Sequence, residues 1–137
     1  YCKYSRDVGD TYIDVDISNQ VVKMYKNGAL VFSASCVTGN RATGTTTDTG
    51  TYYVLNKIRD VVLRGENVDG SEYASPVKYW LGVTWGGQGL HDADWRDTFG
   101  GGIWKTDGSH GCINMPPAQM PALFNAAEVG MPVVMHY

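Results

Sequence analysis

Alternation of apolar and acidic residues near the N-terminus is the feature that most restricts the fold of this chain. Residues 12–17 have the sequence Tyr-Ile-Asp-Val-Asp-Ile, and this period of two is typical of a half-buried β-strand. A second such run occupies residues 21–25. Asn27-Gly28 then predicts a tight hairpin turn, because both residue types accept a positive φ angle. With a third strand at residues 29–37, the sequence predicts a three-stranded β-meander.

The rest of the chain extends this β pattern. We expect strands at residues 51–55 and 78–84, and a final apolar strand at 131–137 that pairs centrally in a sheet. The Gly- and Thr-rich residues 38–50 predict a loop over the end of the sheet. Residues 56–76 are mixed in character, with a short strand at 61–63 and a turn at Asp69-Gly70. They resemble an excursion or lid outside the core.

One helix is expected, over residues 118–129. Pro116-Pro117 precedes it, Pro121 is tolerated if it falls in or just after the first turn, and Gly130 suits a C-terminal cap. The predicted fold class is mainly β, a sandwich of mixed and antiparallel strands with one or two short helices and a lid-like excursion. At 137 residues the chain is expected to hold one domain, residues 11–137, preceded by the end of a linker at residues 1–10.

Composition and charge exclude several classes of function. The net charge of -3 and the lack of a Lys/Arg run argue against nucleic-acid binding. No apolar stretch approaches the roughly 18 residues that a membrane helix needs, so we expect no direct membrane insertion by this fragment. The chain has neither an initiator Met nor a signal peptide. We therefore expect a mature fragment whose anchoring or secretion segment is absent.

The three cysteines, Cys2, Cys36 and Cys112, lack the CxxC spacing of a structural zinc site. We expect no metal and no cofactor. If one cysteine is a catalytic thiol, the other two are left to pair or to stay free. A disulfide between Cys2 and Cys36 is geometrically open and would fit an extracytoplasmic protein.

The chemically richest stretch is Ser109-His110-Gly111-Cys112-Ile113-Asn114. A free thiol is mostly protonated at neutral pH, so a nucleophilic Cys112 needs a base, and His91 and His110 are the candidates. Gly111 lets the backbone turn sharply, so that the N–H groups of Gly111 and Cys112 can point at a developing oxyanion. The alternative for Cys112 is a buried structural thiol. His136, in the last strand, is expected to be a plain strand histidine.

The spacing of these residues resembles the L,D-transpeptidase catalytic domain, the YkuD-type family. That family pattern is a His, a gap, and then Ser/Thr-His-Gly-Cys-hydrophobic-Asn, and here seventeen residues separate His91 from Ser109. The resemblance extends over residues 11–137 through the opening strands, the Val37-Thr38-Gly39 segment with residues 45–52, and the closing helix and strand. Two departures are Asp92 where many members have Gly, and Thr46 or Thr47 where many have Pro.

The resemblance implies a role for each motif position. Cys112 would be the nucleophile and His91 the general base, with the backbone carbonyl of Asp92 orienting His91. Backbone N–H groups of His110, Gly111 and Cys112 would form the oxyanion hole. The His110 side chain would contact substrate or fix the loop. Ser109 and Asn114 are assigned to the substrate-binding set, although bracing of the loop is the stronger expectation for both.

Aromatic residues cluster in sequence around this motif. Core packing explains several of them, but the resemblance places substrate-groove walls near Tyr79, Trp85 and Trp95. Their faces would suit the aliphatic stem of a diamino acid. Four acids near the site could receive its ammonium group, although a solvated loop is the stronger reading for the set: Asp92, Asp94, Asp97 and Asp107.

As the resemblance implies, the function is acyl transfer between peptidoglycan stem peptides, outside the cytoplasm at the cell wall or cell surface. Cys112 would attack the carbonyl of the third residue of a donor tetrapeptide, release D-Ala and pass the acyl group to an acceptor amine as a 3→3 cross-link. Carbapenem β-lactams would acylate the same thiol. One alternative is hydrolysis of the same bond, as an L,D-carboxypeptidase or endopeptidase. The other is a non-enzymatic wall-binding or metal-binding module.

Overall fold

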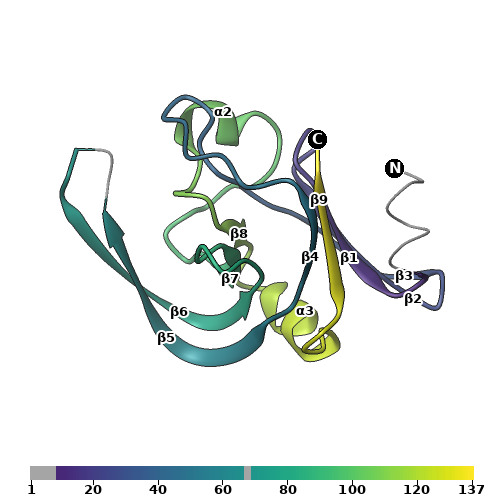
Figure 1. The fold of residues 1–137 in the computed structure, drawn as a ribbon. Helices are drawn as coiled ribbons and strands as arrows, with labels where there is room; N and C mark the ends of the chain where they lie inside the picture. The colour runs from purple at the N-terminus through teal and green to yellow at the C-terminus, as the bar shows by residue number, and fades with distance from the viewer. Residues whose placement is uncertain (1–8, 67–68) are drawn as a thin grey trace.

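The computed structural model describes residues 9–66 and 69–137, which form two β-sheets and two short helices (Figure 1). The first sheet has the strand order β3-β2-β1-β9-β4. Its β1 and β9 strands are parallel and its other pairs are antiparallel. The strands are β1 (Tyr12–Asp16), β2 (Val21–Lys26), β3 (Ala29–Ser35), β4 (Gly50–Tyr53) and β9 (Pro132–His136).

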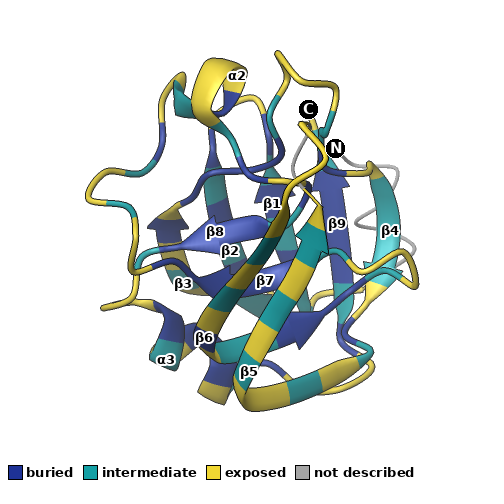
Figure 2. Ribbon diagram, turned by 90° about the vertical axis from the view of Figure 1, so that its left-hand side faces the viewer, coloured by how far each residue is buried: buried dark blue, intermediate teal, exposed yellow. Residues whose placement is uncertain are grey.

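The second sheet has the order β5-β6-β7-β8 and holds the candidate site. Only its β7–β8 pair is parallel, which places Asn114 beside His91. In Figure 2, β7 and β8 are buried along their lengths, whereas β5 alternates exposed and half-buried residues. The strands are β5 (Asn56–Glu66), β6 (Glu72–Gly82), β7 (Gly89–Asp92) and β8 (Ile113–Met115).

The expected meander and the mainly β fold are confirmed. Both turn residues between β2 and β3 have positive φ angles, 51° at Asn27 and 81° at Gly28, as the hairpin prediction requires. The last strand, β9, lies between β1 and β4, so it pairs on both edges as expected for an apolar strand. The third strand ends at Ser35, two residues earlier than predicted.

The excursion at residues 56–76 is more regular than its sequence indicates. Instead of one short strand at 61–63, β5 and β6 each have 11 residues and form a long antiparallel hairpin. Its pairing skips between Arg59 and Val61, where Asp60 has a φ angle of 53°. Mixed polarity concealed these strands because much of the hairpin is exposed on at least one face.

The predicted helix is shorter than expected. Helix α3 (Met120–Ala126) carries Pro121 in its first turn, where the missing N–H costs little, and its C-cap is Ala127 instead of Gly130. The second short helix that the fold class allowed is α2 (Ile103–Asp107); its position was not predicted, because five residues give no readable periodicity. None of the helices in the described part of the chain is long and apolar enough to cross a membrane.

The core lies between the two sheets and under α3. It consists of aliphatic and Met side chains that are fully buried, among them Ile13, Val15, Met24, Leu81, Leu90, Ile113, Met120, Leu123 and Met135. Cys36 is part of this core, and burial raises its pKa well above the usual range for a thiol. The proposed Cys2–Cys36 disulfide and most of the expected linker (residues 1–10) fall outside the described residues.

Candidate active site

Cys112 lies at the entry to β8, at the end of a tight loop that follows α2. Gly111 has a φ angle of 127°, a conformation that residues with a Cβ rarely adopt. The glycine of the His-Gly-Cys motif is therefore required by backbone geometry. The turn leaves Cys112 half-buried at the wall of a cavity while Ile113, the next residue, enters the core.

The loop that carries the Ser109–Asn114 motif, called the motif loop below, is held by hydroxyl groups from the Gly- and Thr-rich loop at residues 38–50. Thr47 donates to the carbonyl of Gly111 at 2.7 Å and accepts the N–H of Gly39 at 3.0 Å. Thr45 donates to the carbonyl of Ser109 at 3.1 Å. Gly39 also forms a β-bridge to Ser109. The loop at residues 38–50 therefore fixes the backbone of the motif loop. The sequence did not predict this role.

Ser109 acts as a brace inside the motif. Its hydroxyl donates to the carbonyl of Cys112 and accepts the N–H of Gly111 at 3.1 Å. This second bond corrects one expectation, because the Gly111 N–H is already occupied and is not aimed at a developing oxyanion. The remaining backbone candidates from the predicted oxyanion hole are the N–H groups of His110 and Cys112.

His91 is buried on β7, and its ring nitrogens are distinguished by one hydrogen bond. Nδ1 lies 2.7 Å from the carbonyl oxygen of Asp92. A carbonyl oxygen can only accept, so Nδ1 carries the hydrogen and Nε2 keeps its lone pair. The neutral tautomer that this bond selects is the one in which Nε2 can act as a base. Asp92 supplies the contact through its backbone, so the change from Gly leaves it intact.

Two indole rings hold the His91 ring. Trp80 stacks on it with ring centroids 5.9 Å apart, and Trp95 packs against it at 5.8 Å. Burial in this apolar setting lowers the pKa of His91, an effect opposed by the Asp92 carbonyl and charge and reinforced by the nearby Arg96. The imidazole is therefore neutral at neutral pH, as a general base must be.

The Asp92 side chain has a separate structural role. Its carboxylate accepts the backbone N–H of Lys78 at 3.0 Å and that of Tyr79 at 2.8 Å. Both donors belong to β6, so the carboxylate ties the end of β7 to β6. This contact lies next to Trp80 and His91, the last residues that the two strands pair. Asp92 thus fixes the position of the carbonyl that holds His91.

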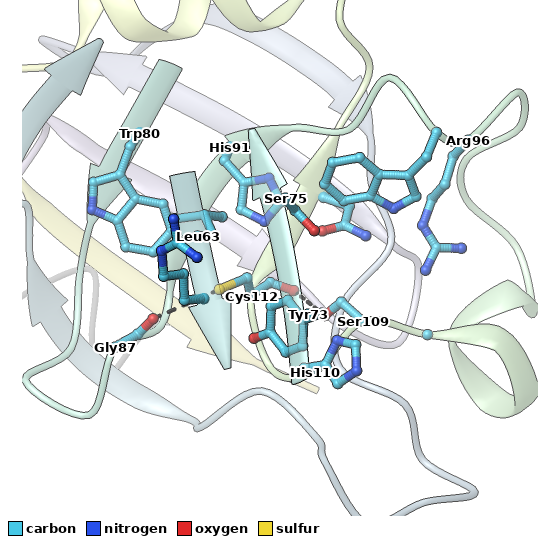
Figure 3. A pocket seen from close by; sticks show the side chains of 14 residues that line it. Leu63, Tyr73, Ser75, Trp80, Gly87, His91, Arg96, Ser109, His110 and Cys112 are labelled. Carbon is cyan, nitrogen blue, oxygen red and sulfur yellow. Dashed lines mark hydrogen bonds between the residues drawn. The ribbon is translucent and has the colours of Figure 1, made fainter. Parts of the chain in front are cut away.

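Cys112 and His91 line the same cavity, which has a volume of about 220 Å³ (Figure 3). The Cys112 thiol lies 3.7 Å from the carbonyl oxygen of Gly87, to which it donates. Burial raises the pKa of Cys112, and a backbone hydrogen bond from Gly89 opposes the shift. The resting pair is therefore a neutral thiol and a neutral imidazole.

Among the predicted groove residues, the structure brings Trp95, Ser109, His110 and Asn114 to this cavity and leaves out Tyr79 and Trp85. Tyr79 packs on Phe124 of α3 with ring centroids 5.1 Å apart. Trp85 is 92% exposed on the turn between β6 and β7. Neither of these two is a wall of the cavity, which corrects the expectation for both.

Sequence reasoning missed several walls of the cavity. Trp80 lines the cavity, whereas the prediction named its neighbour on β6, Tyr79. Tyr73 also lines the cavity and stacks on His110 with ring centroids 4.4 Å apart. The distal half of the β5–β6 hairpin also contributes Leu63, Arg64 and Ser75. Tyr73 and Trp80 belong to the aromatic cluster of the sequence, but that cluster carried no sign of which members face the thiol.

The four acids that might have received an ammonium group do not line the cavity. The Asp92 carboxylate faces β6, and Asp94, Asp97 and Asp107 are exposed. Within residues 9–66 and 69–137, no three His, Cys, Asp or Glu side chains are arranged to hold a metal ion. His136 pairs with Asp14 at 2.6 Å, and these two residues lie on β9 and β1 of the first sheet.

The fold and the cavity define a two-sheet β protein with a cysteine and an oriented histidine in one site. A family model of the L,D-transpeptidase catalytic domain matches residues 10–135, and the chain belongs to that family.

Curated relatives include L,D-transpeptidase 1 of Mycobacterium tuberculosis, which is 28% identical over 133 residues. That match covers 93% of this chain and 51% of the relative, so the chain spans about half the length of the curated relatives that it matches first.

Solved structures give a similar result. A crystal structure of an Enterococcus faecium L,D-transpeptidase mutant matches with a TM-score of 0.88 and 44% identity, over 94% of this chain and 50% of the other. The catalytic domain of E. faecium L,D-transpeptidase acylated by ertapenem matches with a TM-score of 0.81 and 47% identity. In that case the match covers 93% of this chain and 97% of the other, so this chain corresponds in extent to an isolated catalytic domain.

Proposed function

We propose that this chain is the catalytic domain of a peptidoglycan L,D-transpeptidase in which Cys112 is the nucleophile and His91 the general base. The observation that carries the proposal is the 2.7 Å contact between His91 Nδ1 and the Asp92 carbonyl, which leaves Nε2 as a base in the cavity that Cys112 lines. The Asp92 carbonyl acts here as the third member of the catalytic group.

In the acylation step, Nε2 of His91 takes the thiol proton as Sγ attacks the carbonyl carbon of the third residue of a donor tetrapeptide. The developing oxyanion accepts hydrogen bonds from backbone N–H groups of Cys112 and His110. The imidazolium then returns the proton to the departing nitrogen. The C–N bond breaks, D-Ala leaves as the free amino acid, and a thioester joins the donor stem to Cys112.

In the second step an acceptor amine attacks the thioester carbonyl. His91 takes a proton from this amine, the C–S bond breaks, and the proton passes to the sulfur. The product is an amide between two third residues, a 3→3 cross-link, and the thiol is restored. Ser109 holds the turn, while His110, stacked on Tyr73, and Asn114 line the path of the substrate.

The relatives support this proposal through their chemistry as well as their fold. The E. faecium catalytic domain has been solved acylated by ertapenem, and L,D-transpeptidase 1 of M. tuberculosis is the curated relative described above. By the same chemistry, a carbapenem would acylate Cys112 in this chain. Its place of action would be the cell wall, outside the cytoplasm.

Mass spectrometry tests the proposal. A carbapenem should add one adduct, mapped to the peptide that carries Cys112, and a Cys112→Ala variant should add none. Cys36 is an internal control, because its buried thiol should stay unlabelled in both proteins. An adduct that persists in Cys112→Ala would contradict the assignment of the nucleophile.

A tetrapeptide substrate distinguishes the transferase from the hydrolytic alternative. Cross-linking releases D-Ala and yields a dimeric product, whereas hydrolysis releases D-Ala and yields only a tripeptide. If the wild-type protein binds wall fragments, releases no D-Ala and forms no adduct, the non-enzymatic alternative is correct.

A further inference from the structure

The cavity at Cys112 carries the opposite charge from the chain as a whole. The protein has 14 Asp and Glu against 11 Lys and Arg. Nevertheless the described residues that line the cavity include two arginines, Arg64 and Arg96, but no acid. A cavity that concentrates cationic groups in an acidic chain favours an anionic ligand.

Arg96 is the more confined of the two arginines, and its charge is poorly matched. Its side chain is only 12% exposed, and Nη1 donates to the backbone carbonyl of Asp107 at 2.8 Å. Its buried Nε has no hydrogen-bond partner among the described residues. The nearest carboxylate atom, on Asp107, lies at 3.8 Å, and that side chain is 88% exposed. Because water screens such a pair, most of the guanidinium charge remains uncompensated.

The position of Arg96 connects it to the reacting groups. It follows Trp95, which packs on the His91 ring, and Figure 3 shows it at one end of the cavity, beyond Ser109. Its charge acts on His91, whose pKa it helps to lower. An anion bound to Arg96 would therefore lie in the same cavity as the carbonyl that Cys112 attacks.

We infer that Arg96 binds the terminal carboxylate of the donor stem, on the residue that leaves when Cys112 attacks. This inference rests on the proposed function and names the group by which the donor is recognised. The leaving residue is joined to the attacked carbonyl, and adjacent Cα atoms are about 3.8 Å apart, so its carboxylate is the nearest substrate anion. A guanidinium matches a carboxylate with two parallel hydrogen bonds.

The assignment explains how a donor can be selected by its length. Only a stem that ends one residue after the attacked carbonyl presents its carboxylate to Arg96. A stem with one further residue carries a neutral amide there, and its carboxylate is displaced. Once the residue has left, Arg96 no longer retains the acylated stem.

The test compares tetrapeptide donors that end in a free carboxylate or in a carboxamide, with wild type, Arg96→Gln and Arg96→Lys. Arg41→Gln is the matched control, because Arg41 is exposed and packs near Trp104 outside the cavity. Hydrogen bonds to charged groups contribute about 1.5–3 kcal/mol, so kcat/KM of Arg96→Gln for the acid should fall roughly 10- to 100-fold. Arg96→Gln should treat acid and amide alike, Arg96→Lys should be intermediate, and Arg41→Gln should behave as wild type.

Two results would overturn the inference. One is an equal loss on acid and amide donors in Arg96→Gln, which would indicate a structural role. The other result would come from comparing the effect of Arg96→Gln on donors that carry Lys and on donors that carry diaminopimelate at the third position. If the Arg96 effect requires the diaminopimelate carboxylate and ignores the terminal group, the residue binds a different part of the stem.

Binding to a Cys112→Ala background separates this inference from the proposed function. In a calorimetric titration, Cys112→Ala should bind the acid donor about 10-fold or more tightly than the amide. The preference should vanish in the Cys112→Ala/Arg96→Gln double variant. If that pattern holds while the wild type releases no D-Ala, the proposed reaction is wrong and the carboxylate site at Arg96 is supported. If the wild type releases D-Ala but neither background prefers the acid donor, the proposed reaction is supported and the carboxylate site is wrong.

Discussion

Nδ1 of His91 lies 2.7 Å from the carbonyl oxygen of Asp92, the next residue in the chain. A histidine oriented by its own neighbour's backbone needs no separate acidic residue to select its tautomer. What must be fixed is the backbone of β7, and the Asp92 carboxylate does this through Lys78 and Tyr79.

His91→Ala should slow carbapenem acylation of Cys112 by about 10²- to 10⁴-fold, the range expected for the loss of a general base. Stopped-flow measurement of adduct formation gives the rate. His110→Ala is the comparison, because His110 is exposed and stacks on Tyr73, and it should be less damaging. If His110→Ala is the slower variant, the base has been assigned to the wrong histidine.

The acid limb of the kcat/KM profile should lie below pH 6.5, the ordinary value for histidine. Burial disfavours the imidazolium and lowers the pKa of His91, so the ring remains an available base at lower pH than a free histidine would. Arg96 contributes to this lowering, so Arg96→Gln should raise the pKa of His91 and move the limb to higher pH. A limb that moves to lower pH in Arg96→Gln would contradict the charge relationship.

Asp92→Ala should reduce both stability and activity, although the catalytic carbonyl is retained. The change leaves two part-buried N–H groups of β6 without this acceptor, which should cost about 1 kcal/mol in the free energy of unfolding, and kcat/KM should fall about 10-fold. Urea unfolding and D-Ala release measure the two effects. Asp92→Asn keeps an acceptor oxygen and should stay close to wild type; equal losses in both variants would argue against the bracing role.

Gly39→Ala should destabilise the loop beneath the motif. A Cβ at this position would lie 2.0 Å from the backbone carbonyl oxygen of Thr45, so backbone must shift, and we expect a loss of at least about 2 kcal/mol. Gly102→Ala is the matched control, since its nearest contact is at 4.0 Å, and it should change stability by less than about 0.5 kcal/mol. Thermal unfolding compares them, and similar melting temperatures would contradict the packing argument.

Trp80→Ala should impair acylation more than Tyr79→Ala, although the two residues are adjacent. Trp80 stacks on His91 and lines the cavity, whereas Tyr79 packs on Phe124. We expect about a 10-fold loss in acylation rate for Trp80→Ala from a less ordered base. For Tyr79→Ala the main effect should be on stability. A slower acylation in Tyr79→Ala than in Trp80→Ala would instead support the sequence-based expectation that Tyr79 is the groove wall.

Local signals in the sequence were sufficient for much of the fold. The alternation at residues 12–17 and the Asn27-Gly28 turn specify the meander, and the apolar run at 131–137 specifies a central strand. These features depend on neighbours a few residues apart, which is why period and turn chemistry predict them. The proposed reactive pair was also predicted, because Cys112 and His91 both belong to a specific motif.

Tertiary structure decided which residues surround that pair. The choice between Tyr79 and Trp80 is a matter of strand register, since a shift of one residue exchanges the two faces of a strand. The hairpin contributes Leu63, Arg64 and Tyr73 only because β5 and β6 continue far beyond the sheet's other strands. The cationic character of the cavity likewise depends on residues from separate segments, Arg64 on β5 and Arg96 after β7. The sequence by itself determined the meander, the central last strand and the proposed reactive groups. Pairing between distant strands determined the cavity, because the residues that line it share no local sequence pattern.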